Sequence, residues 1–234
     1  MSLPVRVGTL LVAFAAVAVG TAFIVIHYLL GGPALVDYTP TASGGQVNVV
    51  LQEDPQNDST NTPDWVSYYV QDPTNKQWVH TTLFKVPAGT TVNMTILGYD
   101  GCTPARNNYW SHVQGTIGGT VNVRWVDGQG QEGPAHNVSL INAWSHCNVG
   151  HTFAIPSLNV FVPVQSPDAS ASLCSSSPCT SGPHSVEKFS FRTPSHGGTF
   201  RWQCFIPCGG GFIDGNGGPM QTFGYMMGNM EVAS

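Results

Sequence analysis

Short segments in which apolar and polar residues alternate recur through this chain, and they limit its fold more than any other feature. Gln46–Val50 alternates, and so does the longer Lys85–Tyr99 (KVPAGTTVNMTILGY), which turns at Pro87-Ala88-Gly89. A period of two is typical of strands that place one face against a core. Further strand candidates, rich in β-branched and aromatic residues, are Asp64–Val70, Lys76–Phe84, Gly119–Val126, Val186–Arg192, Gly198–Gln203 and Gly224–Val232. The polar run Gln52–Pro63 is expected to be a loop.

The composition agrees with an all-β fold. The 234 residues include 27 Gly and 17 Pro, whereas only 9% are charged, a profile that favours a turn-rich β domain over a helical one. The length suits one globular domain with a terminal appendage. Lys and Arg total 8 against 13 acidic residues, so no basic face is expected and nucleic acid is excluded as a partner.

The appendage lies at the N-terminus, where Val7–Leu30 carries no charged residue. About two dozen apolar residues suffice to cross a bilayer as a helix, whereas the apolar core of a cleaved signal peptide runs only about 7 to 15 residues. Arg6 is the nearest positive charge, which places the N-terminus inside. We therefore expect a single-pass transmembrane anchor at residues 1–32 in the cell membrane and an extracytoplasmic or periplasmic domain at residues 33–234.

Six cysteines suggest disulfides, since an even number is typical of chains outside the cytosol. Cys174 and Cys179 lie in a Ser/Pro-rich segment (LCSSSPC) and are expected to form a local disulfide. A disulfide between Cys102 and Cys147 is a guess, because connectivity cannot be read from sequence. Cys204 and Cys208 have a second interpretation, as metal ligands.

Two stretches carry the chemistry. One is His151-Thr-Phe-Ala-Ile-Pro-Ser-Leu-Asn, and the other is Gln203-Cys204-x3-Cys208-Gly, followed by a methionine-rich tail with Met220 and Met226. Imidazole and thiolate donors together select copper or zinc, and a thioether favours copper. We expect these groups to be offered from loops at one end of a β-sandwich. The sequence contains neither a nucleophile elbow nor an HExxH motif, which disfavours hydrolysis.

These motifs resemble a known family. The run V-P-A-G-T-T-V-N-M-T-I resembles the cupredoxin strand that leads to the first metal-ligand loop, and the His151 and Cys204 stretches resemble cytochrome c oxidase subunit II, which carries the dinuclear CuA centre. The resemblance spans roughly Lys85 to Val232. It implies a cupredoxin-like Greek-key β-sandwich on one N-terminal helix, with insertions at about 101–147 and 165–184.

The resemblance also implies a copper site. His151 would bind through a ring nitrogen, Cys204 and Cys208 would bridge two coppers, Ile206 would offer its backbone carbonyl, and Met226 would be the thioether ligand. The implied role is an electron-transfer subunit of a respiratory oxidase. It would dock on a membrane catalytic subunit and accept electrons from cytochrome c or a small copper protein.

The sequence departs from this family at one ligand. The family expects a second His three residues before the Met, where this chain has Phe223, which cannot ligate copper. Three outcomes stay open: a metal-free relative in which Cys204 and Cys208 form a disulfide; a single copper held by His151, one Cys and Met226 or Met220; or a distant ligand, His146 or His196.

The metal-free outcome implies a different function. The chain could be a copper-free structural or interaction module whose disulfide-stapled loops contact other proteins, and copper delivery or storage is a third reading. The first insertion contains several aromatic and histidine residues, for which local packing is favoured over a docking surface or an extra metal ligand. They are Tyr109, Trp110, His112, His136, Trp144 and His146.

Overall fold

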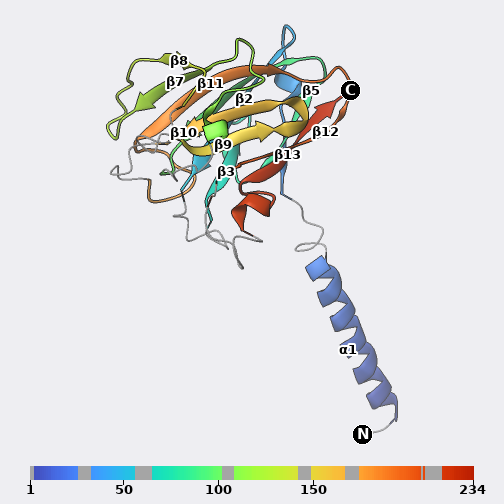
Figure 1. Ribbon diagram of the computed structural model, residues 1–234. Helices are drawn as coiled ribbons and strands as arrows, with labels where there is room; N and C mark the ends of the chain where they lie inside the picture. Colours follow the sequence, from blue (N-terminus) through green and yellow to red (C-terminus); the bar gives the residue numbers. More distant parts are fainter. Residues whose placement is uncertain are drawn as a thin grey trace. The chain divides into compact units, whose positions relative to one another are not determined.

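The computed structural model describes residues 3–25, 33–55, 65–101, 108–141, 149–166, 174–206, 208 and 218–234. It divides into two compact units, Met1–Pro33 and Ala34–Ser234. The first contains the single α-helix, α1 (Leu3–Ile24), and the second contains thirteen strands, so the described chain is mostly β (Figure 1). The all-β part of the expected fold is confirmed.

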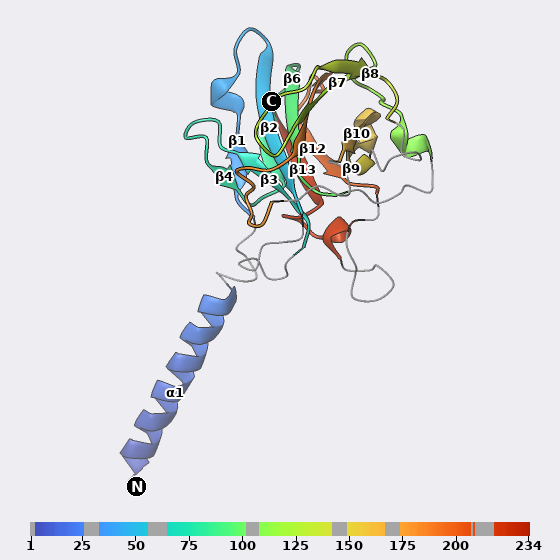
Figure 2. The ribbon, with the colours of Figure 1, turned by 90° about the vertical axis from the view of Figure 1, so that its left-hand side faces the viewer.

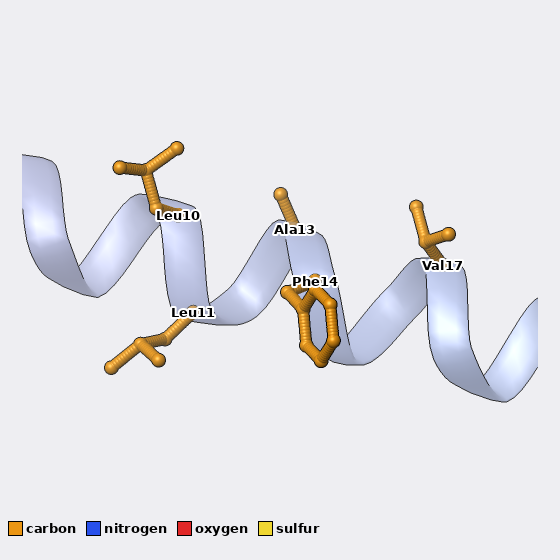
Figure 3. A pocket seen from close by; sticks show the side chains of 5 residues that line it. All are labelled: Leu10, Leu11, Ala13, Phe14 and Val17. Atoms are coloured by element: carbon orange, nitrogen blue, oxygen red, sulfur yellow. The ribbon is translucent and has the colours of Figure 1, made fainter.

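Helix α1 is 22 residues long, and its described residues from Gly8 to Ile24 are exposed. Figure 3 shows five of them, and Leu10 and Phe14 are 69% and 75% exposed. Among the described residues, however, no helix meets the length and apolarity that a membrane span requires. The N-terminal helix was predicted correctly, and the transmembrane part of that prediction is not supported.

Two sheets form the second unit. The six-stranded sheet has the order β1-β5-β13-β12-β9-β10, and the seven-stranded sheet has the order β4-β3-β2-β6-β11-β7-β8. Both orders join strands that are distant in sequence, so the chain crosses repeatedly between the sheets (Figure 2). The strands are β1 (Leu35–Asp37), β2 (Gln46–Asp54), β3 (Ser67–Gln71), β4 (Trp78–Val79), β5 (Leu83–Pro87), β6 (Thr91–Gly98), β7 (Val121–Val126), β8 (His136–Val138), β9 (Val149–Ile155), β10 (Val160–Gln165), β11 (His184–Arg192), β12 (Gly198–Gln203) and β13 (Met227–Ala233).

The core lies between the sheets and is built by the alternation seen in the sequence. Every second residue of β6 is buried, as expected for a strand with one face on a core. Trp202 is fully buried at the centre, and its ring lies 5.1 Å from that of Tyr68 and 5.0 Å from that of Phe153. These rings come from β12, β3 and β9, so the core ties the two sheets together.

Two boundaries differ from the prediction. The segment predicted as one strand, Lys76–Phe84, contributes β4 to one sheet and β5 to the other. The polar run Gln52–Pro63 was predicted as a loop, but its first three residues belong to β2 and are at most 1% exposed. Side-chain and backbone partners from other segments make burial of these polar residues tolerable, and the pattern of one strand does not reveal such partners.

The first predicted insertion extends the seven-stranded sheet. Strand β7 pairs with β11, and β8 pairs with β7 at the edge of the sheet. A short 3-10 turn, η3 (Asn108–Ser111), packs the ring of Trp110 flat on that of Phe205, with centroids 4.6 Å apart and an interplanar angle of 8°. This contact favours the local-packing interpretation. Cys102, Trp144, His146 and Cys147 lie outside the described residues, so the guessed disulfide stays untested.

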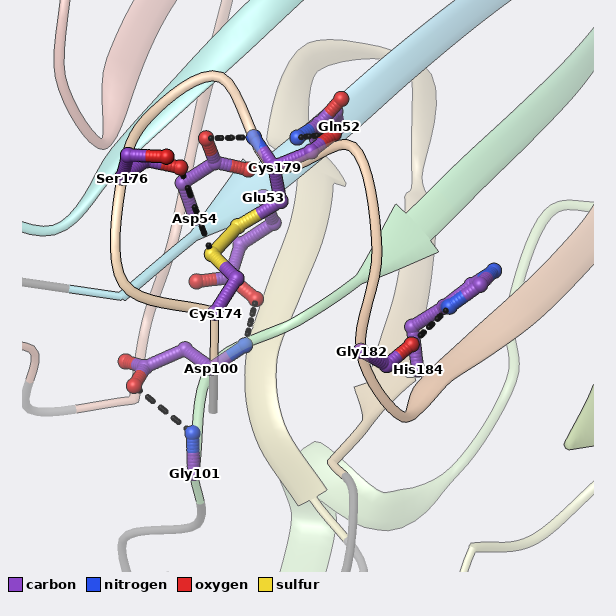
Figure 4. Close-up of a disulfide and its surroundings, with 10 residues drawn as sticks. All are labelled: Gln52, Glu53, Asp54, Asp100, Gly101, Cys174, Ser176, Cys179, Gly182 and His184. Carbon is purple, nitrogen blue, oxygen red and sulfur yellow. Dashed lines mark hydrogen bonds between the residues drawn. A yellow bond between two sulfur atoms is a disulfide. The ribbon is translucent and has the colours of Figure 1, made fainter. Parts of the chain in front are cut away.

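The second predicted insertion contains the expected local disulfide, Cys174–Cys179. Its loop docks on the end of β2 (Figure 4). There Gln52 Nε2 donates to the Cys179 carbonyl at 2.8 Å, and the Cys179 N–H donates to Asp54 Oδ2 at 2.9 Å. We call the loop 174–179 the disulfide clip. Three further 3-10 turns complete the unit: η2 (Thr39–Thr41), η4 (Pro156–Leu158) and η5 (Pro219–Gln221).

Candidate metal centre

His151 is the third residue of β9, an internal strand whose seven residues are all buried. The expectation of a loop position for this residue was therefore wrong. Because all seven residues are buried, β9 shows no alternation between buried and exposed positions. A strand holds its side chains more rigidly than a loop does, so the imidazole has a fixed direction.

The two cysteines follow directly after β12. The Cys204 N–H donates to the Met226 carbonyl at 2.9 Å, which continues the pairing of β12 with the chain that enters β13. The Phe205 N–H donates to Thr152 Oγ1 at 2.8 Å, and the Thr152 N–H lies 3.3 Å from Cys204 Sγ. These bonds attach the cysteine loop to β9 beside His151.

Imidazole and thiols converge at this point. His151 Nδ1 lies 2.9 Å from Cys208 Sγ and 3.7 Å from Cys204 Sγ, and the two sulfurs are 3.1 Å apart. A disulfide would bring the sulfurs to about 2.05 Å, whereas both cysteines here are free and buried. The structure therefore does not form the Cys204–Cys208 disulfide that was one of the open outcomes.

A backbone carbonyl faces the sulfur pair. The Ile206 oxygen lies 2.8 Å from Cys208 Sγ and 3.5 Å from Cys204 Sγ, and its role as a ligand stays a prediction. A methionine sulfur lies beside the cysteine loop, because Met220 Sδ accepts the Cys208 N–H at 3.3 Å. Met226 is fully buried and bonds to Cys204 through its carbonyl. Its role as thioether ligand stays a prediction.

Sequence reasoning missed two carboxylates on the far side of the imidazole. His151 Nε2 lies 2.9 Å from Asp100 Oδ2 and 3.0 Å from Glu53 Oε1. Glu53 comes from the end of β2, and Asp100 follows shortly after β6. Strands β2 and β6 pair with each other in parallel, which brings the two residues together. The scarcity of charged residues, combined with strand alternation carried past Leu51, could have singled out Glu53.

Burial and neighbouring charges determine how these groups ionise. Burial lowers the pKa of His151, but the charges of Cys208 and Glu53 outweigh it, so the pKa lies well above its usual value. Burial raises the pKa of Cys204, yet hydrogen bonds with Cys208 and His151 hold it well below the ordinary thiol value. Burial and the neighbouring Cys204 raise the pKa of Cys208. These directions favour a thiolate at Cys204 and an imidazolium at His151.

The other histidine candidates lie elsewhere. His112 and His196 are exposed, and the ring of His80 lies 4.9 Å from that of Tyr69 and 5.2 Å from that of Tyr225. Among the described residues, no further histidine joins the cluster of His151, Cys204 and Cys208. Phe223, the residue at the position where the family has its second histidine, is 44% exposed.

The donor set fits copper. One imidazole nitrogen and two thiol sulfurs lie within 4.8 Å of one another, all from buried residues. Thiolate sulfur with imidazole selects soft metals, copper and zinc among them. The lowered pKa of Cys204 favours such a site, because the thiolate is the species that binds, whereas Cys208, whose pKa is raised, would have to lose its proton on binding.

Comparison with known proteins gives only remote similarities. No protein-family model and no curated protein sequence matches the chain. Rusticyanin from Thiobacillus ferrooxidans, a cupredoxin, aligns at 16% identity over 85% of this chain and 82% of that chain, with a TM-score of 0.33. A histidine-to-methionine variant of rusticyanin aligns at 16% identity over 86% and 84%, with a TM-score of 0.34.

A copper-containing nitrite reductase from Thermus scotoductus aligns at 12% identity over 89% of this chain and 33% of that chain, with a TM-score of 0.25. TM-scores of this size decide neither the family nor the function. The chain is thus mostly β with cupredoxins among its structural neighbours, and it carries a buried His/Cys/Cys cluster. Nothing in these comparisons supports the features specific to oxidase subunit II.

Proposed function

We propose that this protein binds copper through His151, Cys204 and Cys208 and acts as an electron-transfer protein. The observation that carries the proposal is the convergence of one imidazole nitrogen and two free, buried thiols at 2.9 to 3.7 Å. When bound, copper would supply one-electron redox chemistry. The protein's part is to hold the three donors on β9 and on a loop anchored to it, so that their positions change little between oxidation states.

The finer form of the proposal is a role like that of subunit II in a haem-copper oxidase. A dinuclear centre would use the paired thiols and the Ile206 carbonyl, which faces both sulfurs. The docking partner would then be a membrane catalytic subunit, and the donor would be cytochrome c or a small copper protein. The Cys174–Cys179 disulfide supports an extracytoplasmic location.

Anaerobic titration of the reduced protein with copper tests the proposal. We expect intense visible absorption from thiolate coordination, lost in Cys204→Ser, Cys208→Ser and His151→Ala. His112→Ala is the matched control, because His112 is exposed and outside the cluster. An EPR signal shared by two coppers would support the subunit II form, whereas a single-copper signal would leave the simpler electron-transfer protein.

Absence of colour in the wild-type protein, with Cys204 and Cys208 found as a disulfide by mass spectrometry, would overturn the proposal in favour of a copper-free interaction module. Tight Cu(I) binding with slow electron exchange would instead indicate copper delivery or storage.

A further inference from the structure

Two carboxylates lie at the Nε2 edge of the His151 ring, on the side away from the thiols. Asp100 Oδ2 lies 2.9 Å and Glu53 Oε1 lies 3.0 Å from the same ring nitrogen, Nε2. The Glu53 side chain is 1% exposed and that of Asp100 is 23% exposed. Copper donors such as Nδ1 and the thiols lie on the opposite edge of the ring, so the carboxylates do not compete for that position.

Both carboxylates are themselves held in place. Glu53 Oε2 accepts the Asp100 N–H at 3.2 Å, and Asp100 Oδ1 accepts the Gly101 N–H at 2.7 Å (Figure 4). Each acid therefore uses one oxygen for the backbone and points the other at His151. The disulfide clip holds the residues on either side of Glu53 through Gln52 and Asp54.

The single N–H at Nε2 can donate its hydrogen bond to only one of the two acids at a time. A neutral imidazole has one N–H, and when Nδ1 binds a metal that proton is on Nε2. Asp100 Oδ2 makes the hydrogen bond with Nε2 at 2.9 Å, and Glu53 Oε1 lies 3.0 Å from the same nitrogen, where it pairs with the ring by charge. A buried carboxylate in this position is costly unless positive charge lies nearby.

We propose that Asp100 and Glu53 are positioning residues for the candidate copper site, with Asp100 fixing the ring so that Nδ1 faces the thiols and Glu53 holding Asp100 and favouring the more positive state of the centre. The inference rests on the proposed copper function. It adds two residues to the site and states how they affect the reduction potential. The pair stabilises oxidised over reduced copper and keeps the potential low.

Isosteric variants of the full-length protein test this role. In Asp100→Asn and Glu53→Gln we expect Cu(II) affinity to fall by about 10- to 100-fold, the effect usual for partners of metal-bound histidine. Cu(I) affinity should fall less, so the reduction potential should rise. Asp100→Glu, which restores the carboxylate, should recover part of the Cu(II) affinity.

Glu187→Gln is the matched control. Glu187 is also fully buried in the seven-stranded sheet and also accepts a backbone N–H, from Gln165, but it is not part of the His151 cluster. We expect it to leave the absorption spectrum and the potential unchanged. If both Asp100→Asn and Glu53→Gln bind copper with wild-type affinity and potential, the positioning role is overturned. If Glu53→Gln fails to fold, the more exposed Asp100 decides the test.

A measurement without copper separates this inference from the proposed function. In the metal-free, 15N-histidine-labelled protein we expect the His151 Nε2–H to exchange slowly with solvent and to shift in Asp100→Asn but not in Glu187→Gln. If the wild-type protein gives this result but binds no copper, the positioning role of the two acids stands and the copper function is rejected. A rapidly exchanging Nε2–H that is insensitive to Asp100→Asn would reject the positioning role whatever the protein binds.

Discussion

Glu187 is a second buried carboxyl, and it gives the protein a defined pH dependence. Its Oε1 accepts the Gln165 N–H at 2.5 Å, its Oε2 has no hydrogen-bond partner among the described residues, and burial raises its pKa to about 8. The unfolded chain has an ordinary Glu pKa near 4.5. Between these values the native state keeps a proton that the unfolded state releases, so stability falls as pH rises.

The slope that Glu187 contributes is about 1.4 kcal/mol per pH unit within that window. We expect Glu187→Gln to stabilise the protein more at pH 8 than at pH 5, because Gln keeps an acceptor for the Gln165 N–H and carries no proton to lose. Urea unfolding at both pH values measures this difference. Glu132→Gln, at a residue whose side chain is 57% exposed, is the control. An equal effect of Glu187→Gln at the two pH values would contradict the prediction.

Substitution can show which of two methionines near the cysteine loop is the thioether ligand. Met220 Sδ faces the Cys208 N–H, whereas Met226 contacts Cys204 through its backbone. We expect Met220→Leu to weaken Cu(I) binding more than Met226→Leu does, because the Met220 sulfur contacts the backbone of the cysteine loop. Cu(I) affinity from chelator competition measures both. A larger loss in Met226→Leu would restore the ligand assigned from the family resemblance.

Individual residues also show what the sequence could reveal about the site. The order of the two motifs and their resemblance to a copper-binding family identified His151, Cys204 and Cys208, which the structure brings together. Glu53 and Asp100 were missed, since each becomes meaningful only through long-range pairing of β2 with β6. The polar run after Leu51 was read as a loop for the same reason: its partners, Cys179 and His151, lie far along the chain.

The disulfide clip is the element most directly joined to the site. Its Cys179 backbone bonds to Gln52 and Asp54, on both sides of Glu53. We expect Cys174→Ser/Cys179→Ser to lower the free energy of unfolding by about 2 kcal/mol, the chain-entropy value for so short a loop. Because the end of β2 loses its clamp, copper affinity should fall as well. Urea unfolding and chelator competition measure the two effects.

Cys204 and Cys208 are intact in that variant, so any loss of copper affinity is indirect. Unchanged affinity alongside reduced stability would show that β2 holds Glu53 without the clip.

Among the elements, strands with clear alternation such as β6 were predicted closely, with bounds of Thr91–Gly98. Strand β9 was not, because burial of all seven residues removes the period that identifies a strand.

The division of the whole molecule leads to the last prediction. The buried hydrophobic core of the described residues runs from Val36 to Val232, entirely within the second unit, whereas the apolar side chains of α1 are exposed. We expect a protein of residues 34–234 to fold with the urea midpoint of the full-length chain and to bind the same number of coppers per molecule. Its solubility should rise, because exposed apolar side chains such as Leu10 and Phe14 promote association.

Circular dichroism, urea unfolding and copper titration of residues 34–234, beside the full-length protein in the same buffer, test this expectation. A lower midpoint would mean that the first unit stabilises the sandwich, and a lower copper stoichiometry would mean that a metal ligand depends on it. Equal values would place folding and metal binding in the sandwich alone, because every residue of the candidate site, from Glu53 to Met220, belongs to that unit.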